Sequence, residues 1–305
     1  MRNFLAEGRK QHVIMKKILI TGATGNIGRE VVRCLLEWQA ENAVIAGVRD
    51  PDKAKSKFAE DPRLRFIHFD FEDPATYHAA LENIDTVFLL RPPHLSDVKA
   101  WFRPLVGKMK EMSVGQVVFL SVQGADKSKI IPHHKIEKLI REAGIHYIFL
   151  RPGYFMQNLT TTLKDDIQQK RKIILPAGKA KFNWIDGRNI GEAAAILLDR
   201  FEEYRNQALD LTGYENKDFA EVVRQINQVT EKPIRYVSVS PLRFYLIKRK
   251  DEISKGMVFV MILLHFLPRF QKQPTISGHY EQLTGKRPTF LKEFITREQR
   301  HFNSQ

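Results

Sequence analysis

Short runs of apolar and β-branched residues recur along the first half of the chain, separated by amphipathic stretches. Each run is of strand length and apolar on both sides, which is typical of strands buried between two layers of helices. The pattern predicts six such strands, at Ile18–Ile20, Val44–Val48, Phe66–Phe69, Val87–Leu90, Val117–Leu120 and Tyr147–Leu150.

The stretches between these runs have the spacing of helices. They lie at Arg29–Trp38, Asp52–Glu60, Ala75–Leu81, Asp97–Met112 and His133–Ala143. Regular alternation of strand and helix brings successive strands into one parallel sheet with helices on both faces. We therefore predict the α/β class, with a Rossmann-type doubly wound parallel sheet.

The alternation stops after Leu150. One more strand is predicted at Ala208–Leu211, and from Lys217 onward prolines interrupt a mainly helical pattern. We expect a flexible leader at residues 1–15 and a Rossmann domain at 16–153, to which 186–214 return. A smaller, mainly helical substrate lobe is expected from 154–185 and 215–305. In this lobe Met257–Leu264 is apolar on all sides, which is typical of a helix buried in a hydrophobic core. The alternatives are that this helix forms the wall of a substrate pocket or packs in a subunit interface.

The composition excludes several classes of protein. The chain has 305 residues and is 43% hydrophobic, which argues against disorder. Its single cysteine, Cys34, excludes an intramolecular disulfide and is expected as a core residue of a protein in a reducing compartment, the cytoplasm. The longest apolar run is far shorter than the about 20 residues that span a bilayer, so no membrane partner is expected.

The net charge is +14, but lysines and arginines are scattered along the chain. No zinc-finger spacing and no RNA-recognition signature accompanies them. We therefore expect a solvated basic surface and neither a nucleic-acid partner nor a metal site.

Three glycines, Gly22, Gly25 and Gly28, lie between the first predicted strand and the first predicted helix, in the stretch "KKILITGATGNIGREVV". Glycine permits a tight turn and lets the backbone approach a pyrophosphate, which the helix N-terminus then attracts. In a β-α-β frame this spacing predicts a dinucleotide site that also includes Thr24, Asn26 and Ile27, the alternative being a purely structural turn.

The end of the second strand indicates which dinucleotide is bound. An acidic residue there is typical of NAD binders, because it holds the ribose 2′-hydroxyl. Here Arg49 takes that place and Asp50 follows it. A guanidinium can pair with a 2′-phosphate, so the sequence favours NADP(H), the alternative being an arginine that is merely exposed.

Residues that follow the other strands are expected along the same edge of the sheet. Asp70 and Phe71 end the third strand and are expected near the adenine. Leu90, Arg91 and Pro92 end the fourth, and their loop is expected to border the nicotinamide.

Five motifs in order, "TGATGNIG", "VRDPDKA", "FLSVQGAD", "IREAGIHYIFLRPGYFMQNL" and "LTGKRPTFLKEF", resemble the NmrA-like family of atypical short-chain dehydrogenases/reductases. The resemblance extends from about Lys16 to Phe294 and implies an NADP-binding Rossmann domain with a small C-terminal substrate lobe. It also implies that Pro152, Tyr154 and Phe155 lie along the nicotinamide and the substrate. Asn158 and Trp184 are weaker candidates.

The acid that the wider group uses, a tyrosine in Tyr-x-x-x-Lys, is missing, because no tyrosine lies between Tyr77 and Tyr147. If Glu137 matches the acidic residue one turn after the family's lysine, His133 takes the lysine's place, as in the quinone-reductase branch. His133 is then a candidate proton donor or a ligand of the ribose, and a structural role is the alternative. Ser121 ends the fifth strand, in the region of the group's catalytic serine.

The resemblance implies two kinds of function. One is an NADPH-dependent oxidoreductase that transfers hydride to a small, flat acceptor such as a quinone, without the usual acid. The other is an NADP(H)-sensing regulator with little turnover, which would need a protein partner. The sequence leaves a monomer and a homodimer open.

Overall fold

A seven-stranded parallel sheet forms the centre of the chain in the computed structural model, which describes residues 15–38, 42–129 and 131–303. In spatial order its strands are β10 (Gln207–Leu211), β6 (His146–Pro152), β5 (Gln116–Leu120), β4 (Thr86–Leu90), β1 (Lys17–Thr21), β2 (Ala43–Val48) and β3 (Leu64–His68). All seven predicted strands are confirmed, and so is the doubly wound α/β fold. The predicted leader lies outside the described residues except for Met15.

The order of the strands reverses between β1 and β4, which are neighbours with Leu19 opposite Val87. From β1 the chain first builds outward through β2 and β3, and then returns to build the other half from β4. At such a switch point the loops after the two central strands diverge and leave a crevice at the carboxyl edge. This is the edge where ligands of open α/β sheets bind.

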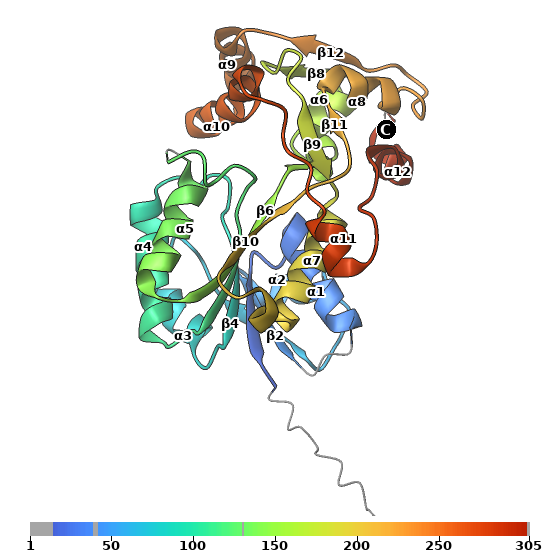
Figure 1. The fold of residues 1–305 in the computed structure, drawn as a ribbon. Coiled ribbons are helices and arrows are strands. Elements are labelled where there is room, and N and C mark those ends of the chain that lie inside the picture. Colours follow the sequence, from blue (N-terminus) through green and yellow to red (C-terminus); the bar gives the residue numbers. More distant parts are fainter. Residues whose placement is uncertain (1–14, 39–41, 130, 304–305) are drawn as a thin grey trace, which may run out of the picture.

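Helices cover both faces of the sheet (Figure 1). One face carries α3 (Tyr77–Leu81), α4 (Val98–Glu111) and α5 (Pro132–Ala143), and the other carries α1 (Asn26–Glu37) and α7 (Gly187–Asp199). The predicted helix at Asp52–Glu60 is shorter than expected, since α2 ends at Lys55 (Pro51–Lys55).

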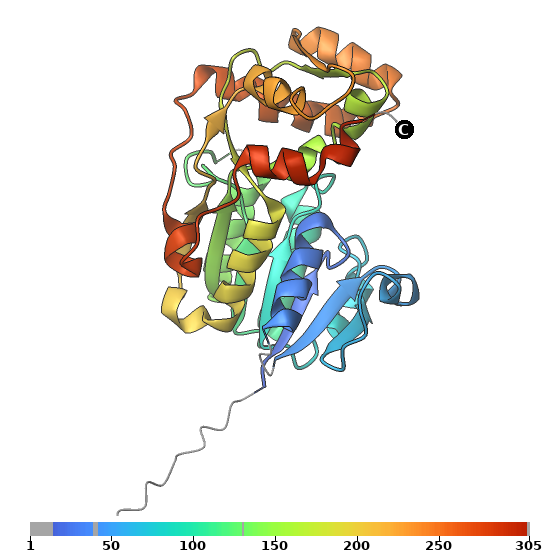
Figure 2. The same cartoon turned by 90° about the vertical axis from the view of Figure 1, so that its right-hand side faces the viewer.

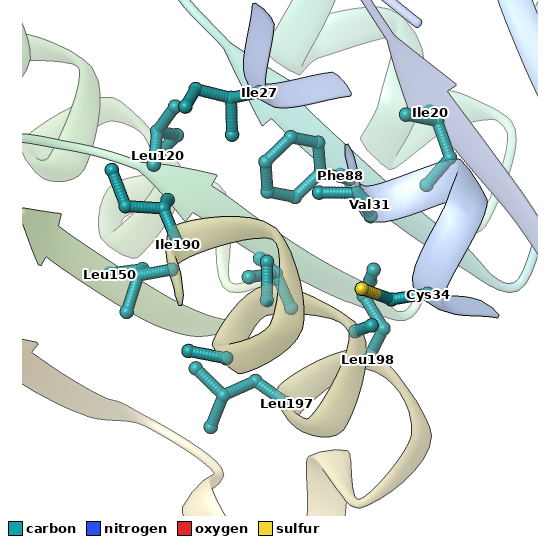
Figure 3. Packing of buried hydrophobic residues seen from close by; sticks show 14 of the residues in the cluster. Ile20, Ile27, Val31, Cys34, Phe88, Leu120, Leu150, Ile190, Leu197 and Leu198 are labelled. Atoms are coloured by element: carbon teal, nitrogen blue, oxygen red, sulfur yellow. The ribbon is translucent and has the colours of Figure 1, made fainter. Parts of the chain in front are cut away.

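The face beneath α1 and α7 holds the core that Figure 3 shows. Ile27 and Val31 of α1 pack with Ile190 and Leu197 of α7 over the strands. Cys34 lies in this core as a free thiol, as predicted, and burial raises its pKa to about 11. At neutral pH the thiol is therefore protonated and behaves as a small apolar side chain.

A smaller lobe lies over the carboxyl edge of the sheet (Figure 2). Its strands are β7 (Tyr154–Phe155), β8 (Lys172–Leu175), β9 (Phe182–Ile185), β11 (Asn216–Lys217) and β12 (Arg235–Ser238). Its helices are α6 (Lys164–Gln168), α8 (Phe219–Ile226), α9 (Pro241–Lys250), α10 (Lys255–Phe266) and α12 (Leu291–Arg297). The lobe has a hydrophobic core of its own, around Trp184, Phe219 and Phe294.

The prediction that Met257–Leu264 is a buried core helix is wrong. This run belongs to α10, of which only Val258, Met261 and His265 are buried. Phe259 is 59% exposed and Leu264 46% exposed, because α10 packs mainly on its neighbour α9 and no element covers its other side in the described chain. None of the described helices is both long and apolar enough to cross a membrane.

Near its C-terminus the chain crosses back to the Rossmann domain. Helix α11 (His279–Thr284) packs on α7, and Tyr280 is buried in the same core as α1. Asn189 of α7 donates a hydrogen bond to the Tyr280 hydroxyl at 2.7 Å. The last segment therefore ties the two lobes together, which the sequence pattern did not predict.

Candidate cofactor-binding site

The turn between β1 and α1 depends on its glycines in different ways. Gly22 has a φ of +60°, in the region that favours glycine, and a Cβ there would lie 2.8 Å from the Leu90 side chain. A Cβ on Gly28 would lie 2.3 Å from the Gly22 carbonyl oxygen. Gly25 is different, since it is exposed and its Cβ would contact only that same oxygen, at 3.2 Å. Gly22 and Gly28 therefore close the turn, and Gly25 leaves the space in front of it open.

The N-terminus of α1 is open to a ligand. Gly25 caps the helix without any side-chain hydrogen bond, and the first turn contains no acidic residue. Asn26 is exposed and Thr24 half-buried, whereas Ile27 points into the core. Unpaired N–H groups and the helix dipole favour an anion at this place, which fits the pyrophosphate of a dinucleotide.

Arg49 is exposed at the end of β2, and no ion pair or hydrogen bond of its side chain is found in the described part of the chain. Its neighbour Asp50 is the N-cap of α2, where its carboxylate accepts from the Lys53 N–H at 3.0 Å. The acidic residue at this strand end is thus used locally, and the free guanidinium remains for a ligand. This arrangement fits a ribose 2′-phosphate better than a 2′-hydroxyl.

The two residues after β3 have separate roles. Asp70 is half-buried, and its carboxylate accepts from the N–H of Glu72 at 3.0 Å. Phe71 is buried, with its ring 4.9 Å from that of Phe69 and 5.7 Å from that of Phe102. The Phe71 side chain therefore belongs to the hydrophobic core. A contact with the adenine would have to come from the backbone of Phe71 or from Asp70.

The loop after β4 is held by its own arginine. The Arg91 Nη1 donates to the carbonyl oxygens of Pro92, Pro93 and Leu95, at 3.1, 3.1 and 2.9 Å. Leu90 lies against Gly22, so this loop also borders the glycine turn. Burial lowers the pKa of Arg91 to about 10, so the side chain stays charged at neutral pH.

His133 stands in the first turn of α5 and faces this loop. Its Nε2 accepts a long hydrogen bond, 3.4 Å, from the Nε of Arg91, which places the ring proton on Nδ1. Burial and then the charge of Arg91 lower the pKa of His133 to about 3. The imidazole is therefore neutral at physiological pH, and its Nε2 has no proton to give.

Ser121 belongs to a buried polar network. Its hydroxyl donates to Glu137 Oε1 at 2.6 Å, and Arg151 donates to both oxygens of the same carboxylate, at 2.9 and 2.7 Å. Glu137 is completely buried. The Ser121 proton is thus engaged within the protein, and the network connects the ends of β5 and β6 to α5.

The segment after β6 enters the small lobe. Pro152 is buried at the end of the strand, and Phe155 packs against the Rossmann core. Tyr154 is buried in the aromatic core of the lobe, and its hydroxyl lies 2.9 Å from His265 Nε2. Burial raises the pKa of Tyr154 and lowers that of His265 to about 4. The sequence did not reveal this pair, because the partners are 111 residues apart.

The two weaker candidates, Asn158 and Trp184, and also Asn189 of α7 have partners within the protein. Asn158 is hydrogen-bonded to the Tyr154 side chain. Trp184 is completely buried, and its Nε1 donates to the Lys217 carbonyl oxygen at 3.0 Å. Asn189 does not cap α7, since Asp186 is the N-cap and accepts from the Arg188 N–H at 3.1 Å. Asn189 instead accepts from the N–H of Thr289 at 2.9 Å and so fixes the C-terminal segment.

The fold thus brings the glycine turn, Arg49, Asp70, the Leu90–Pro92 loop, Ser121 and His133 to one edge of the sheet. The helix N-terminus and the free guanidinium can hold the phosphates of a dinucleotide. The three candidate proton donors each have a partner within the protein: Ser121 donates to Glu137, His133 Nε2 accepts from Arg91, and the Tyr154 hydroxyl lies against His265. The arrangement can therefore bind and orient a hydride carrier but does not present one of these groups as an acid.

Comparison with known proteins agrees with this geometry. The profile of the NmrA-like family matches residues 15–265. The chain is 30% identical to Prestalk A differentiation protein A of Dictyostelium discoideum over 278 residues, 91% of this chain and 90% of the other. It is 32% identical to an NAD(P)H azoreductase of Xenophilus azovorans over 229 residues, 73% of this chain and 77% of the other. Among solved structures, the quinone oxidoreductase QOR2 of Escherichia coli, complexed with NADPH, has a TM-score of 0.78 at 21% identity, covering 92% of this chain and 99% of that one.

Proposed function

The chain belongs to the NmrA-like family, and from this premise we propose that it is an NADPH-dependent oxidoreductase that reduces a small, flat acceptor such as a quinone or an azo compound. The observation that carries the proposal is the cradle formed by the open N-terminus of α1 and the unpaired Arg49. The similar azoreductase and quinone oxidoreductase are consistent with it.

The residues of the chain account for binding and orientation. The glycine turn and the N-terminus of α1 hold the pyrophosphate, Arg49 holds the 2′-phosphate, and the Leu90–Pro92 loop positions the nicotinamide. When bound, NADPH supplies the hydride. Because Ser121, His133 and Tyr154 are engaged within the protein, the product takes its proton from water. This suits a quinone, whose reduced form is stable as an anion, and an azo compound, whose reduced nitrogen is basic enough to be protonated by water.

Turnover tests this proposal against its alternative. NADPH oxidation should be measured with a panel of quinones, enones and azo dyes. We expect multiple turnovers with quinones or azo dyes, and little with enones, which need a proton at carbon. Tight NADPH binding without turnover of any acceptor would contradict the enzyme and favour the sensor.

The second candidate, an NADP(H) sensor, has two observations in its favour. The protein contributes no acid from Ser121, His133 or Tyr154, and Prestalk A differentiation protein A, which is similar over most of the chain, is named for a role in differentiation. A sensor would signal by binding a protein partner in one redox state of the cofactor. We place either function in the cytoplasm, where NADPH is available and the buried Cys34 stays reduced.

Replacing Arg49 should change the choice of cofactor. We expect Arg49→Ala to weaken NADPH binding at least tenfold, about 1.4 kcal/mol, because one charge-assisted pair to the 2′-phosphate is lost. NADH affinity should hardly change. Titration of both cofactors into both proteins measures this, and Arg65→Ala, an exposed arginine of β3, is the control. Equal NADPH and NADH affinities in the unmodified protein would contradict the assignment.

Replacing His133 should separate acid catalysis from positioning. A group whose pKa is about 3 is neutral across pH 5–9, so we expect His133→Ala to leave the pH profile of kcat unchanged over this range. The KM for NADPH should rise instead, since the Leu90–Pro92 loop loses a neighbour. Steady-state kinetics from pH 5 to 9 test this. A fall in kcat of roughly 10²–10⁴-fold with unchanged NADPH affinity would identify His133 as a true acid.

A further inference from the structure

A cavity of about 530 Å³ lies in the small lobe, between the loop that joins β8 to β9 and the chain that follows α10. Four of its nine lining residues are cations: Lys179, Lys181, Arg269 and Lys272. None of the nine is acidic. A concave surface with one sign of charge concentrates ions of the opposite sign.

These four cations lack carboxylate partners in the part of the chain that the structure describes. Other cations of the same lobe are paired, such as Lys248 with Asp166 at 2.6 Å and Arg297 with Asp186 at 2.7 Å. Like charges gathered without a counter-charge repel one another, and an anion from outside the chain removes that repulsion. Arg243, Lys250 and Lys255 of the same lobe also lack carboxylate partners in the described residues, so it is the gathering of four such cations around one cavity that points to an anion site.

The wall of the cavity is fixed by backbone geometry. Gly178 has a φ of +57°, and a Cβ there would lie 2.8 Å from the Nε of Arg269. The N–H of Gly178 donates to the Ser238 hydroxyl at 3.1 Å, and its carbonyl oxygen accepts from the Tyr236 hydroxyl at 3.0 Å. The loop is thus anchored on β12, and the glycine allows Arg269 to lie directly against it.

The cavity is connected to the proposed reaction site through one short segment. Gln273 lines the cavity, and two residues later the Thr275 carbonyl oxygen accepts from the Gln123 side chain at 2.7 Å. Gln123 lies in the loop after β5, at the carboxyl edge of the sheet. Two extended residues span at most about 7 Å, so one wall of the cavity lies close to the edge where the acceptor is expected.

We propose that this cavity is a subsite for an oxyanion, a carboxylate or sulfonate carried by the flat aromatic acceptor. This inference rests on the proposed function. The cations hold the anionic substituent while the ring system extends toward the carboxyl edge of the sheet. The preferred acceptors are therefore acidic aromatic quinones or azo compounds rather than neutral ones.

A matched pair of acceptors tests the subsite. NADPH-dependent reduction of 1,4-naphthoquinone and of its 2-sulfonate should be compared in the unmodified protein and in the triple variant Lys179→Gln, Lys181→Gln, Lys272→Gln. The control is Arg243→Gln, Lys250→Gln, Lys255→Gln, which removes the same charge from exposed positions of the same lobe that do not line the cavity.

We expect the ratio of kcat/KM for the sulfonate to that for the neutral quinone to fall about tenfold in the cavity variant, as three screened charge pairs predict. The control should keep the ratio of the unmodified protein. An equal fall in both variants would reflect the field of the whole protein and would overturn the subsite.

Binding without turnover separates this proposal from the proposed function. Calorimetric titration with naphthalene-2-sulfonate at low salt should give a Kd that weakens about tenfold in the cavity variant only. The binding result does not depend on turnover. If naphthalene-2-sulfonate binds as expected but no acceptor is reduced, the subsite is supported and only the proposed enzyme function fails. Naphthalene-2-sulfonate that binds no more tightly than inorganic sulfate, or not at all, would overturn the acceptor subsite.

Discussion

Gly25→Val is expected to abolish cofactor binding while the fold persists. The residue is exposed and has a φ of −80°, which valine adopts without strain, and its Cβ would contact only the Gly22 carbonyl oxygen, at 3.2 Å. The two valine methyl groups would instead fill the space in front of the α1 N–H groups, where the pyrophosphate must lie. We expect NADPH affinity to fall about 100-fold or more, about 2.7 kcal/mol, with little change in Tm.

Two other glycines provide the comparisons. Gly28→Ala should lower Tm, because its Cβ would lie 2.3 Å from a backbone oxygen, and overpacking of this kind costs about 1–3 kcal/mol. Gly107→Val, at a position of α4 where a Cβ meets nothing within 4 Å, should leave NADPH affinity intact. Isothermal titration and thermal unfolding measure both quantities. Retention of NADPH affinity in Gly25→Val would show that the turn has only a structural role.

Arg151→Met should destabilise the protein by about 3–5 kcal/mol. The substitution removes the guanidinium that donates to both oxygens of the completely buried Glu137 carboxylate. The longer contact of Arg141 then compensates this buried charge only in part, which is costly. Arg141→Met is the matched control, since Arg141 contacts the same carboxylate at 3.3 Å but its side chain is 41% exposed. This second loss should stay below about 1 kcal/mol.

Urea denaturation of both variants measures the difference. The double variant Arg151→Met, Glu137→Gln should recover part of the loss, because the amide carries no charge. Equal losses for Arg151→Met and Arg141→Met would contradict a structural role of the network. In that case Ser121 would again be a candidate for contact with a ligand.

Much of the Rossmann domain could be predicted because its signals are local. A strand buried on both faces is apolar along its whole length, and the alternation of such strands with helices permits few topologies. The glycine turn is equally local, since Gly22 and Gly28 meet within seven residues. The exposed arginine at the end of the second strand, Arg49, could also be predicted from the sequence. The role of Asp50 as a helix cap became visible only in the structure.

The small lobe was harder to predict, because its contacts join distant parts of the chain. An apolar helix such as α10 predicts burial, but whether an element covers it depends on the path of the chain. The resemblance to the family implies that Tyr154 lies along the nicotinamide, but it does not reveal that the Tyr154 hydroxyl pairs with His265, from α10. No local pattern encodes a contact between residues so far apart.

The sequence by itself determined the parallel sheet and the glycine turn, since strand periodicity and turn geometry depend on neighbouring residues. The preference for a 2′-phosphate, inferred from the charge at one strand end, stays a prediction. Only the tertiary structure decided the state of the candidate acids, because the neutral His133 and the engaged Ser121 result from burial and from partners on other elements. The same holds for the basic cavity, whose cations come from two segments about 90 residues apart along the chain and meet only when the lobe folds.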